Sequence, residues 1–228
     1  MRQAGAMTGD SWSSAVRRRL GLGRLLALGG PQDGVWVTER AAASVLGAAA
    51  AALPGLAVTS LRLAPAAPEE GVEPVVPAPP TALPPGPLRV SAELAALGGQ
   101  PLPELTARLR EALFTAADER LGLVVSDIDL WVTALLDALP DPASGGPGPS
   151  PAGPPASAAA AAALATPGVA HLTSELGPPV DTAGGHVRVE LATAPARHPL
   201  EVARAVRAAV ARAVPEADSV AVLVTWAG

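Results

Sequence analysis

Two carboxylates in the middle of the chain have the spacing that a metal site or an acid–base pair requires. Asp127 and Asp129 lie two residues apart in a segment with the pattern of a β-strand, so both side chains project from one face. Paired carboxylates of this kind bind divalent cations or exchange protons with a substrate. No third ligand follows nearby, and aspartate is common on the solvent face of an antiparallel strand. We therefore expect a solvated pair, with the metal or acid–base site as the alternative.

The three histidines, His171, His186 and His198, all lie in the C-terminal half of the chain. Two are placed near the starts of successive predicted strands and one precedes a helix, so a pair of them can meet in space. None has the spacing of a metal-binding motif such as His-x-x-x-His. We expect structural or surface roles for all three.

Motifs of the common enzyme classes are absent from the sequence. The chain has no cysteine, and therefore no thiolate nucleophile and no cysteine-ligated zinc. It contains no Gly-x-Ser-x-Gly elbow, no phosphate-binding loop and no complete dinucleotide fingerprint. We predict that the protein is not an enzyme and has no catalytic residue, cofactor or bound metal.

An arginine-rich segment near the N-terminus is the best candidate for contact with a membrane or a partner. Its contact residues are predicted to be Trp12, Arg17, Arg18, Arg19 and Arg24. At helical spacing its apolar residues gather on one side, which suits an anionic membrane surface or a groove on a partner. Each arginine near an anionic surface contributes about 1 kcal/mol, so binding by this segment alone is weak. The alternative is a flexible, solvated arm.

Composition excludes several classes of protein. With 228 residues the chain fits one large or two small domains, and much of its 49% apolar content is alanine, so each core is modest. A net charge of −5 argues against a nucleic-acid binder. Residues 41–61 form the longest uncharged run, but Pro54-Gly55 interrupts it, which favours a buried helix followed by a strand over a membrane span. Arg24 interrupts the apolar core of a possible export signal, so we expect a cytoplasmic protein.

The order of predicted elements recurs along the chain. The first set begins with a strand at 35–37, a helix capped by Thr38 that runs to about residue 53, and a strand at 57–63 with Thr59, Leu61 and Leu63 on one face. It continues with a strand at 88–94 and a helix opened by Pro101 and Pro103. It ends with a strand that has Ile128, Leu130 and Val132 inward. The second set comprises a helix at about 156–165, strands at 170–176 and from Val187 to Leu191, a helix with Val202, Val206 and Val210 inward, and a strand with Val220, Val222 and Val224 inward.

The recurrence predicts an α+β protein made of two tandem helix–strand–strand–helix–strand modules with small antiparallel sheets. Val187-Arg188-Val189 is matched with Leu88-Arg89-Val90, and Pro167-Gly168 with Pro54-Gly55. The expected domains are a flexible Arg-rich arm at 1–33, a first module at 34–137, a linker at 138–155 and a second, divergent module without an opening strand at 156–228. A Pro-rich insertion at 65–87 has no apolar period and is expected to be a disordered or polyproline-like excursion that can be shortened at little cost.

The first module resembles the alkaline shock protein family, the bacterial envelope stress response proteins. The residues that carry the resemblance are Gly34-Val35-Trp36-Val37-Thr38-Glu39-Arg40-Ala41, Leu53-Pro54-Gly55-Leu56, Leu88-Arg89-Val90-Ser91 and Pro101-Leu102-Pro103-Glu104-Leu105. The Pro-rich insertion, the lack of lysine, the Arg-rich arm and the missing opening strand of the second module depart from the family pattern.

The resemblance implies a non-enzymatic scaffold or interaction protein of the envelope-stress type, held near the inner face of the cytoplasmic membrane through protein partners. Membrane contact is then at most peripheral, and homo-oligomerisation fits the modest cores. The alternative, from another branch of the family, is a regulatory module that binds an enzyme of fatty-acid synthesis. A third class, an RNA-binding domain of the KH type, lacks its Gly-x-x-Gly clamp here.

Overall fold

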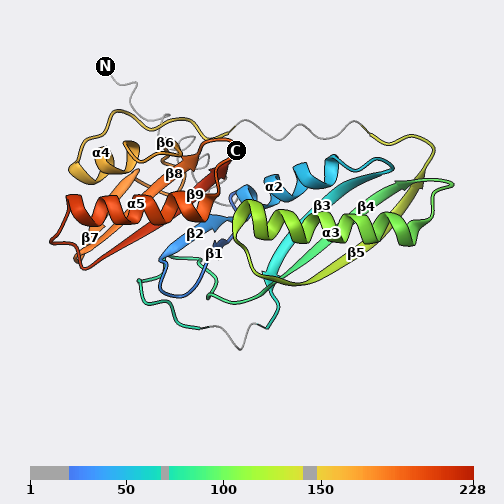
Figure 1. Cartoon of the computed structure of the whole chain (residues 1–228), viewed down its shortest axis with the longest axis horizontal. Helices are drawn as coiled ribbons and strands as arrows, with labels where there is room; N and C mark the ends of the chain where they lie inside the picture. The colour runs from blue at the N-terminus through green and yellow to red at the C-terminus, as the bar shows by residue number, and fades with distance from the viewer. Residues whose placement is uncertain (1–20, 68–71, 141–147) are drawn as a thin grey trace, which may run out of the picture.

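The structure, a computed structural model, describes residues 21–67, 72–140 and 148–228. It is elongated, with a sheet in each half and the helices α3 (Leu102–Leu121) and α5 (Pro199–Ala213) lying end to end along its length (Figure 1). The carboxyl end of α3 meets the amino end of α5, where His198 Nε2 lies 3.4 Å from the carbonyl oxygen of Asp118. The α+β class predicted from the sequence is confirmed.

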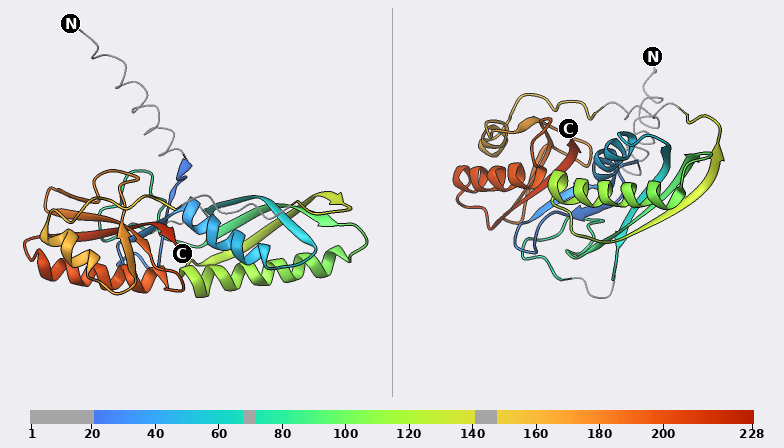
Figure 2. Two further views of the ribbon diagram at one scale, coloured as in Figure 1. Left: turned by 90° about the horizontal axis from the view of Figure 1, so that it is seen from above. Right: turned by 45° about the vertical axis from the view of Figure 1, so that its right-hand side comes forward.

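The N-terminal half contains a three-stranded sheet in the order β3-β4-β5, formed by Leu56–Pro65, Leu88–Leu97 and Val125–Leu136. The helices α2 (Glu39–Ala51) and α3 lie over one face of it (Figure 2). Strands β3 and β4 are antiparallel, whereas β4 and β5 are parallel. The expectation of purely antiparallel sheets is therefore wrong, because the crossover through α3 returns the chain in the same direction.

The C-terminal half has the same order of pairing. Strand β6 (Val169–Leu172) is antiparallel to β8 (His186–Thr193), and β8 is parallel to β9 (Ser219–Ala227). A short additional strand, β7 (Val180–Ala183), also pairs with β8. The helix α4 (Ala158–Leu164) and α5 pack together on this half, in the places that α2 and α3 take on the other.

Two strands from the start of the chain complete the second sheet. Strand β1 (Leu25–Ala27) is antiparallel to β2 (Val35–Thr38), and β2 is parallel to β9, with Trp36 opposite Leu223. The sheet therefore has six strands, in the order β1-β2-β9-β8-β6 with β7 beside β8. The strand expected to open the first module lies in the sheet of the second, at the position where that module was expected to have none.

The predicted flexible arm at 1–33 is wrong for residues 21–33. Leu22, Leu25, Leu26 and Leu28 are buried, and Leu28 donates its N–H to the carbonyl of Val35. Burial of four leucines within seven residues stabilises this short hairpin against the entropy of ordering it. Residues 1–20 lie outside the described part of the chain.

One irregularity is shared by the two halves. Beyond the pair Leu94–Val132, strand β5 contains one extra residue, Thr133, and beyond the pair Leu191–Val224, strand β9 contains Thr225 in the same way. The Oγ1 atom of Thr133 donates to the carbonyl of Leu94 at 3.3 Å, and that of Thr225 to the carbonyl of Leu191 at 3.2 Å. Both are β-bulges that a threonine hydroxyl stabilises.

This shared bulge corrects the equivalence expected from the sequence. Val90 lies opposite Ile128, whereas Val187 lies opposite Val220. With Ile128 and Val220 as counterparts, Val187 corresponds to Val90 and not to Leu88, so the expected match was wrong by two residues. Alternating valines look alike after a shift of two residues, which leaves the side chains on the same face.

Helix starts and stops follow the local sequence. The hydroxyls of Thr38 and Ser157 accept the N–H groups of Ala41 and Ala160, as N-cap residues do. The inward residues predicted for the strands lie on the helix-covered face, except for Thr59. Thr59 is exposed because the register of β3 shifts between Val58 and Ser60.

The Pro-rich insertion is a strap across the second sheet, so the expected disordered excursion is wrong for its described residues. Val76 is 2% exposed and packs with Leu25, Trp36 and Leu223 on the sheet face opposite the helices. Leu83 donates its N–H to the carbonyl of Leu25 at 2.8 Å. The strap therefore joins the first half to the outer face of the second.

Candidate interaction surface

The outer face of the three-stranded sheet is open, in contrast to that of the six-stranded sheet. Outward residues of β4 and β5 include Arg89, Glu93, Asp127 and Trp131, all of them exposed. Trp131 is 51% exposed, although tryptophan is among the residues that gain most from burial. No described segment covers this face, which makes it a candidate for contact with another molecule.

The two aspartates singled out in the sequence lie on this face. Asp127 and Asp129 project outward with side chains close to half exposed, 3.9 and 3.7 Å from nitrogen atoms of Arg89. An arginine between two carboxylates neutralises part of their charge and takes the place that a cation requires. The arrangement agrees with the solvated pair expected from the sequence, and no group of three or more potential metal ligands occurs among the described residues.

The free edge of β5 adjoins the exposed tryptophan. In the other half, the equivalent edge of β9 is occupied by β2, and Leu223, the counterpart of Trp131, is 1% exposed. Within the described part of the chain, no strand pairs with the outer edge of β5. The two halves therefore carry the same edge, closed in one and open in the other.

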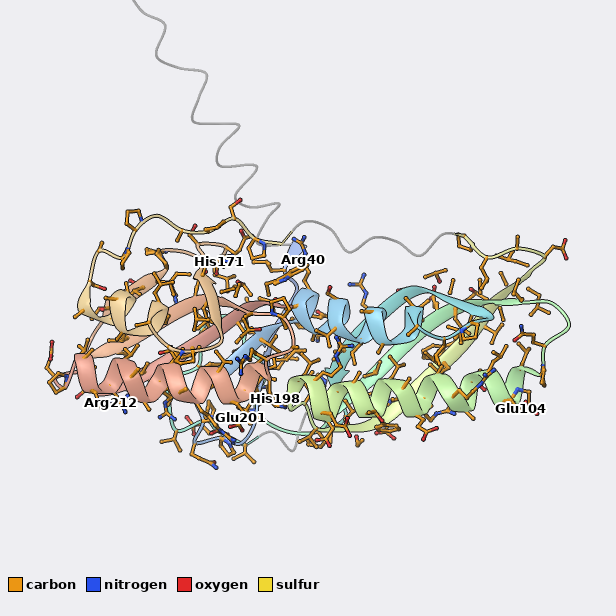
Figure 3. The ribbon with its side chains drawn as sticks, turned by 45° about the horizontal axis from the view of Figure 1, so that its top comes forward. Arg40, Glu104, His171, His198, Glu201 and Arg212 are labelled. Carbon is orange, nitrogen blue, oxygen red and sulfur yellow. The ribbon has the colours of Figure 1, made fainter. Side chains whose placement is uncertain are left out.

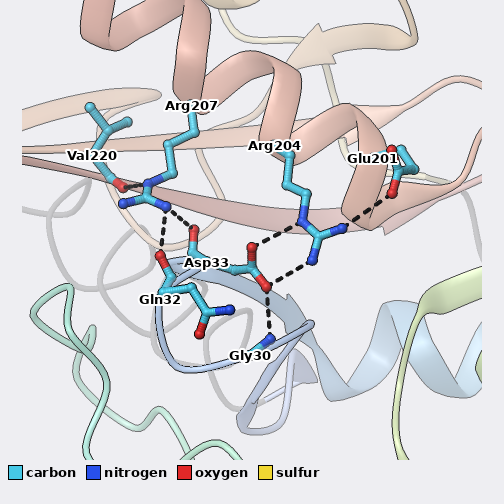
Figure 4. A network of polar contacts seen from close by, with 7 residues as sticks. All are labelled: Gly30, Gln32, Asp33, Glu201, Arg204, Arg207 and Val220. Carbon is cyan, nitrogen blue, oxygen red and sulfur yellow. Dashed lines mark hydrogen bonds and ion pairs between the residues drawn. The ribbon is translucent and has the colours of Figure 1, made fainter.

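In each half, an arginine of the covering helix donates a hydrogen bond to a backbone carbonyl on this edge. Arg207 of α5 donates from Nε to the carbonyl of Val220 at 3.0 Å, and from Nη1 to the carbonyls of Gln32 and Asp33 at 2.7 and 2.8 Å (Figure 4). Arg110 of α3 donates from Nε to the carbonyl of Ile128 at 3.4 Å. No described residue accepts a hydrogen bond from the Nη atoms of Arg110.

The closed edge is fastened further by an ion pair. Asp33 accepts two hydrogen bonds from Arg204, at 2.9 Å from Nε and 3.0 Å from Nη2, and one from the N–H of Gly30 (Figure 4). These donors hold the pKa of Asp33 below its usual range, with the Arg204 hydrogen bonds as the largest cause and burial opposing them. Ala107 takes the place of Arg204 on α3, so the open edge lacks this pair.

A hollow lies between α2 and the outer edge of β3. Its volume is about 830 Å³, and it is lined by small and apolar residues, among them Ala43, Gly47, Ala51, Val58 and Leu139. None of the described residues that line it is titratable. Hydroxyl groups of Ser44, Thr59 and Ser60 also line it, but no titratable side chain that could serve them as a base does.

The three histidines lie apart from this surface and bind separate groups. His171 Nε2 lies 3.0 Å from the carbonyl oxygen of Pro149, and His186 Nδ1 lies 2.8 Å from the hydroxyl of Ser219. His198 lies at the junction of α3 and α5, whereas His171 lies on the other side of the C-terminal half (Figure 3). The structural roles expected for them agree with these contacts.

A buried carboxylate, Glu190, was not anticipated from the sequence. It corresponds to the exposed Glu93, but the loop after β6 covers it, and it accepts the N–H of Leu176 at 3.0 Å. Its Oε1 lies 3.8 Å from Arg188. Burial raises the pKa of Glu190 to about 7, against the smaller opposing effects of these donors.

The predicted contact residues of the N-terminal segment divide into two groups. Trp12, Arg17, Arg18 and Arg19 lie outside the described residues. Arg24 is exposed just before β1, where its guanidinium donates to the carbonyl of Leu63 and lies 3.8 Å from Glu39. These contacts tie Arg24 to α2 and β3, and contact of its exposed side chain with a membrane or partner stays a prediction.

Sequence reasoning missed Trp131 and Arg110 as members of one surface. Both belong to segments whose secondary structure was predicted, but a strand pattern does not reveal which edge remains unpaired. The recurrence contained a usable signal, since Arg207 and Arg110 hold the same position in corresponding helices.

Comparison with known proteins identified no relative: no family model, no curated protein and no solved structure matches this chain. Among the described helices, none has the length and apolar character needed to cross a bilayer.

Proposed function

We propose that this protein is a non-catalytic interaction protein that binds a protein partner through the outer face and free edge of its three-stranded sheet. The observation that carries the proposal is the contrast between Trp131, half exposed, and its buried counterpart Leu223. The corresponding strand is covered in the C-terminal half and exposed in the N-terminal half. Exposed aromatic residues beside an unpaired strand are typical of recognition sites.

A role of the envelope-stress type is the form of this function that the resemblance favours, with regulation of a fatty-acid synthesis enzyme as the alternative. Both roles need a protein partner and neither needs a catalytic residue. The absence of a titratable residue from the described lining of the groove between α2 and β3 supports a non-catalytic role as well. Association with the inner face of the membrane, through residues 12–19 or an anchored partner, belongs to the same proposal.

Site-specific photo-crosslinking tests the interaction surface. A photoreactive amino acid replaces Trp131 and, in a matched control, Leu164, which is 40% exposed on α4 in the other half. We expect a discrete adduct with one protein from position 131 and none from position 164 in cells of the source organism. Identical adducts from both positions, or none from position 131, contradict the proposal. Membrane fractionation of the adduct then separates a membrane-held partner from a soluble enzyme.

A further inference from the structure

We infer that the free edge of β5 binds an extended peptide segment of a partner protein, which adds as a strand parallel to β5 and is clamped by Arg110. This inference deepens the proposed function and rests on it. The molecule itself contains an example of such a bound segment, because residues 32–38 occupy the equivalent edge of β9. The other half of the chain therefore shows what covers such an edge.

The register of the bound segment follows from the shared bulge. Val35, Trp36 and Val37 lie opposite Val222, Leu223 and Val224. The counterparts of these three residues on β5 are Leu130, Trp131 and Val132, since Leu94–Val132 and Leu191–Val224 precede the same bulge. An added strand therefore pairs along Leu130–Val132, and its middle residue lies beside Trp131.

Backbone groups for the pairing are in place. In the closed half the N–H of Val222 donates to the carbonyl of Gly34 at 3.0 Å, and the carbonyl of Val220 on the same edge is bound by Arg207. Arg110 binds the carbonyl of Ile128, the counterpart of Val220. The N–H of Leu130, the counterpart of Val222, therefore points to the open edge. An extended peptide supplies the carbonyl it requires, as in strand addition to exposed sheet edges.

Arg110 supplies the recognition of the segment that leads into the strand. Arg207 joins the edge carbonyl of β9 to two carbonyls of the chain just before β2. Arg110 already makes the first of these contacts, its side chain is exposed, and no described residue accepts a hydrogen bond from its Nη atoms. A guanidinium in this position selects backbone carbonyls at a turn ahead of the strand, a feature that any sequence can provide. Selectivity for particular side chains then depends on the residue of the bound segment that lies beside Trp131.

The occupant is a different protein and not a second copy of this chain. A closed dimer formed about a two-fold axis perpendicular to the sheet pairs identical edge strands in antiparallel orientation. The pairing of β2 with β9, on which the inference is based, is parallel. The apolar character of Leu130, Trp131 and Val132 requires a segment with β-branched or aromatic residues, of which Val35-Trp36-Val37 is the example in this molecule.

Binding of a labelled peptide that copies residues 30–38 tests the inference. Fluorescence anisotropy is measured with the full-length protein, and with variants Arg110→Gln and Arg108→Gln, the latter an exposed arginine on the same helix. We expect saturable binding that Arg110→Gln weakens by about tenfold or more, since charge-assisted hydrogen bonds are lost, and that Arg108→Gln leaves unchanged. A peptide carrying Trp36→Pro, which lacks the central N–H, should not bind.

Three outcomes overturn the inference. Absence of binding does so, and it leaves the proposed function standing if position 131 still cross-links a partner. Equal binding to wild type and Arg110→Gln means that the peptide enters elsewhere, for example by displacing β2 from β9. If the protein dimerises as its concentration rises and Trp131→Ser abolishes the dimer, the edge binds a second copy of this chain instead.

Discussion

The carboxylate of Asp33 and the guanidinium of Arg204 are joined by two hydrogen bonds, at 2.9 and 3.0 Å, between residues 171 positions apart in the chain. This contact anchors the loop between β1 and β2 to α5, and so keeps β2 on the edge of β9 (Figure 4). The open edge lacks this contact, since Ala107 takes the place of the arginine there.

Replacement of Asp33 by Asn should lower the free energy of unfolding at pH 7 by about 1–2 kcal/mol, discounted because Arg204 is close to half exposed. Since the pKa of Asp33 is lowered by folding, its contribution is present above the unfolded pKa of about 4 and is lost as the pH falls through the folded pKa. Urea unfolding at pH 7 and pH 3 measures both effects. Glu201→Gln, which alters an exposed partner of the same arginine, is the control and should be near neutral. Equal effects of the two substitutions would show that the ion pair does not hold the loop.

Glu190→Gln should stabilise the protein at pH 8 and leave its stability unchanged at pH 4. Folding raises the pKa of Glu190 to about 7, so the folded state binds more protons than the unfolded state between about pH 4.5 and pH 7. Stability of the wild type therefore falls with rising pH across that interval, by about 3 kcal/mol in all. Urea unfolding of both proteins from pH 4 to pH 8 measures this. The control variant Glu93→Gln, at the exposed counterpart, keeps Glu190 and should therefore keep the fall in stability of the wild type. A wild type whose stability rises between pH 5 and pH 7 contradicts the assignment.

Val76→Ala should destabilise the protein by about 1–3 kcal/mol, because it removes two buried methyl groups from the contact of the strap with Trp36. Its neighbour provides the control: Val75 is 76% exposed, and Val75→Ala should change stability by less than about 0.5 kcal/mol. Thermal or urea unfolding distinguishes them. If both substitutions prove neutral, the strap is not packed on the sheet.

Leu109→Ala should cost about 2–5 kcal/mol and Val206→Ala about 2 kcal/mol or less. Both side chains are fully buried and hold corresponding positions in α3 and α5. Chemical denaturation followed by circular dichroism measures the two values. Because one continuous core spans both halves, we expect each variant to unfold in a single transition. Two separate transitions would show that the halves unfold independently.

Local elements of this fold could be predicted because their signals are local. Thr38 caps α2, Pro101 precedes α3, and the alternation from Leu88 to Leu94 places one face of β4 inward. The recurrence of these signals indicated two similar halves. That the halves are copies of one module, and superpose as such, stays a prediction.

Long-range partners could not be predicted in the same way. Strand β2 has four residues, too few to distinguish the edge of β9 from a place beside its own helix. Among the described residues of the Pro-rich insertion, Val76 and Pro85 are buried, too few and too far apart for a periodicity to mark them. The surface around Trp131 was missed for a related reason: its exposure results from the absence of a neighbour, which a strand pattern does not record.

Amide hydrogen exchange at Leu130 and Val132, compared with Val222 and Val224, tests the central claim most directly. Among the described strands, β2 closes the edge of β9, whereas none pairs with the outer edge of β5, so a partner strand is present at one pair of corresponding amides and absent at the other. We predict rapid exchange at Leu130 and Val132 in the protein alone, slow exchange at Val222 and Val224, and protection of the first pair when the peptide copying residues 30–38 is added. Equal protection of all four amides in the protein alone, or no added protection at saturating peptide, would contradict an open recognition edge.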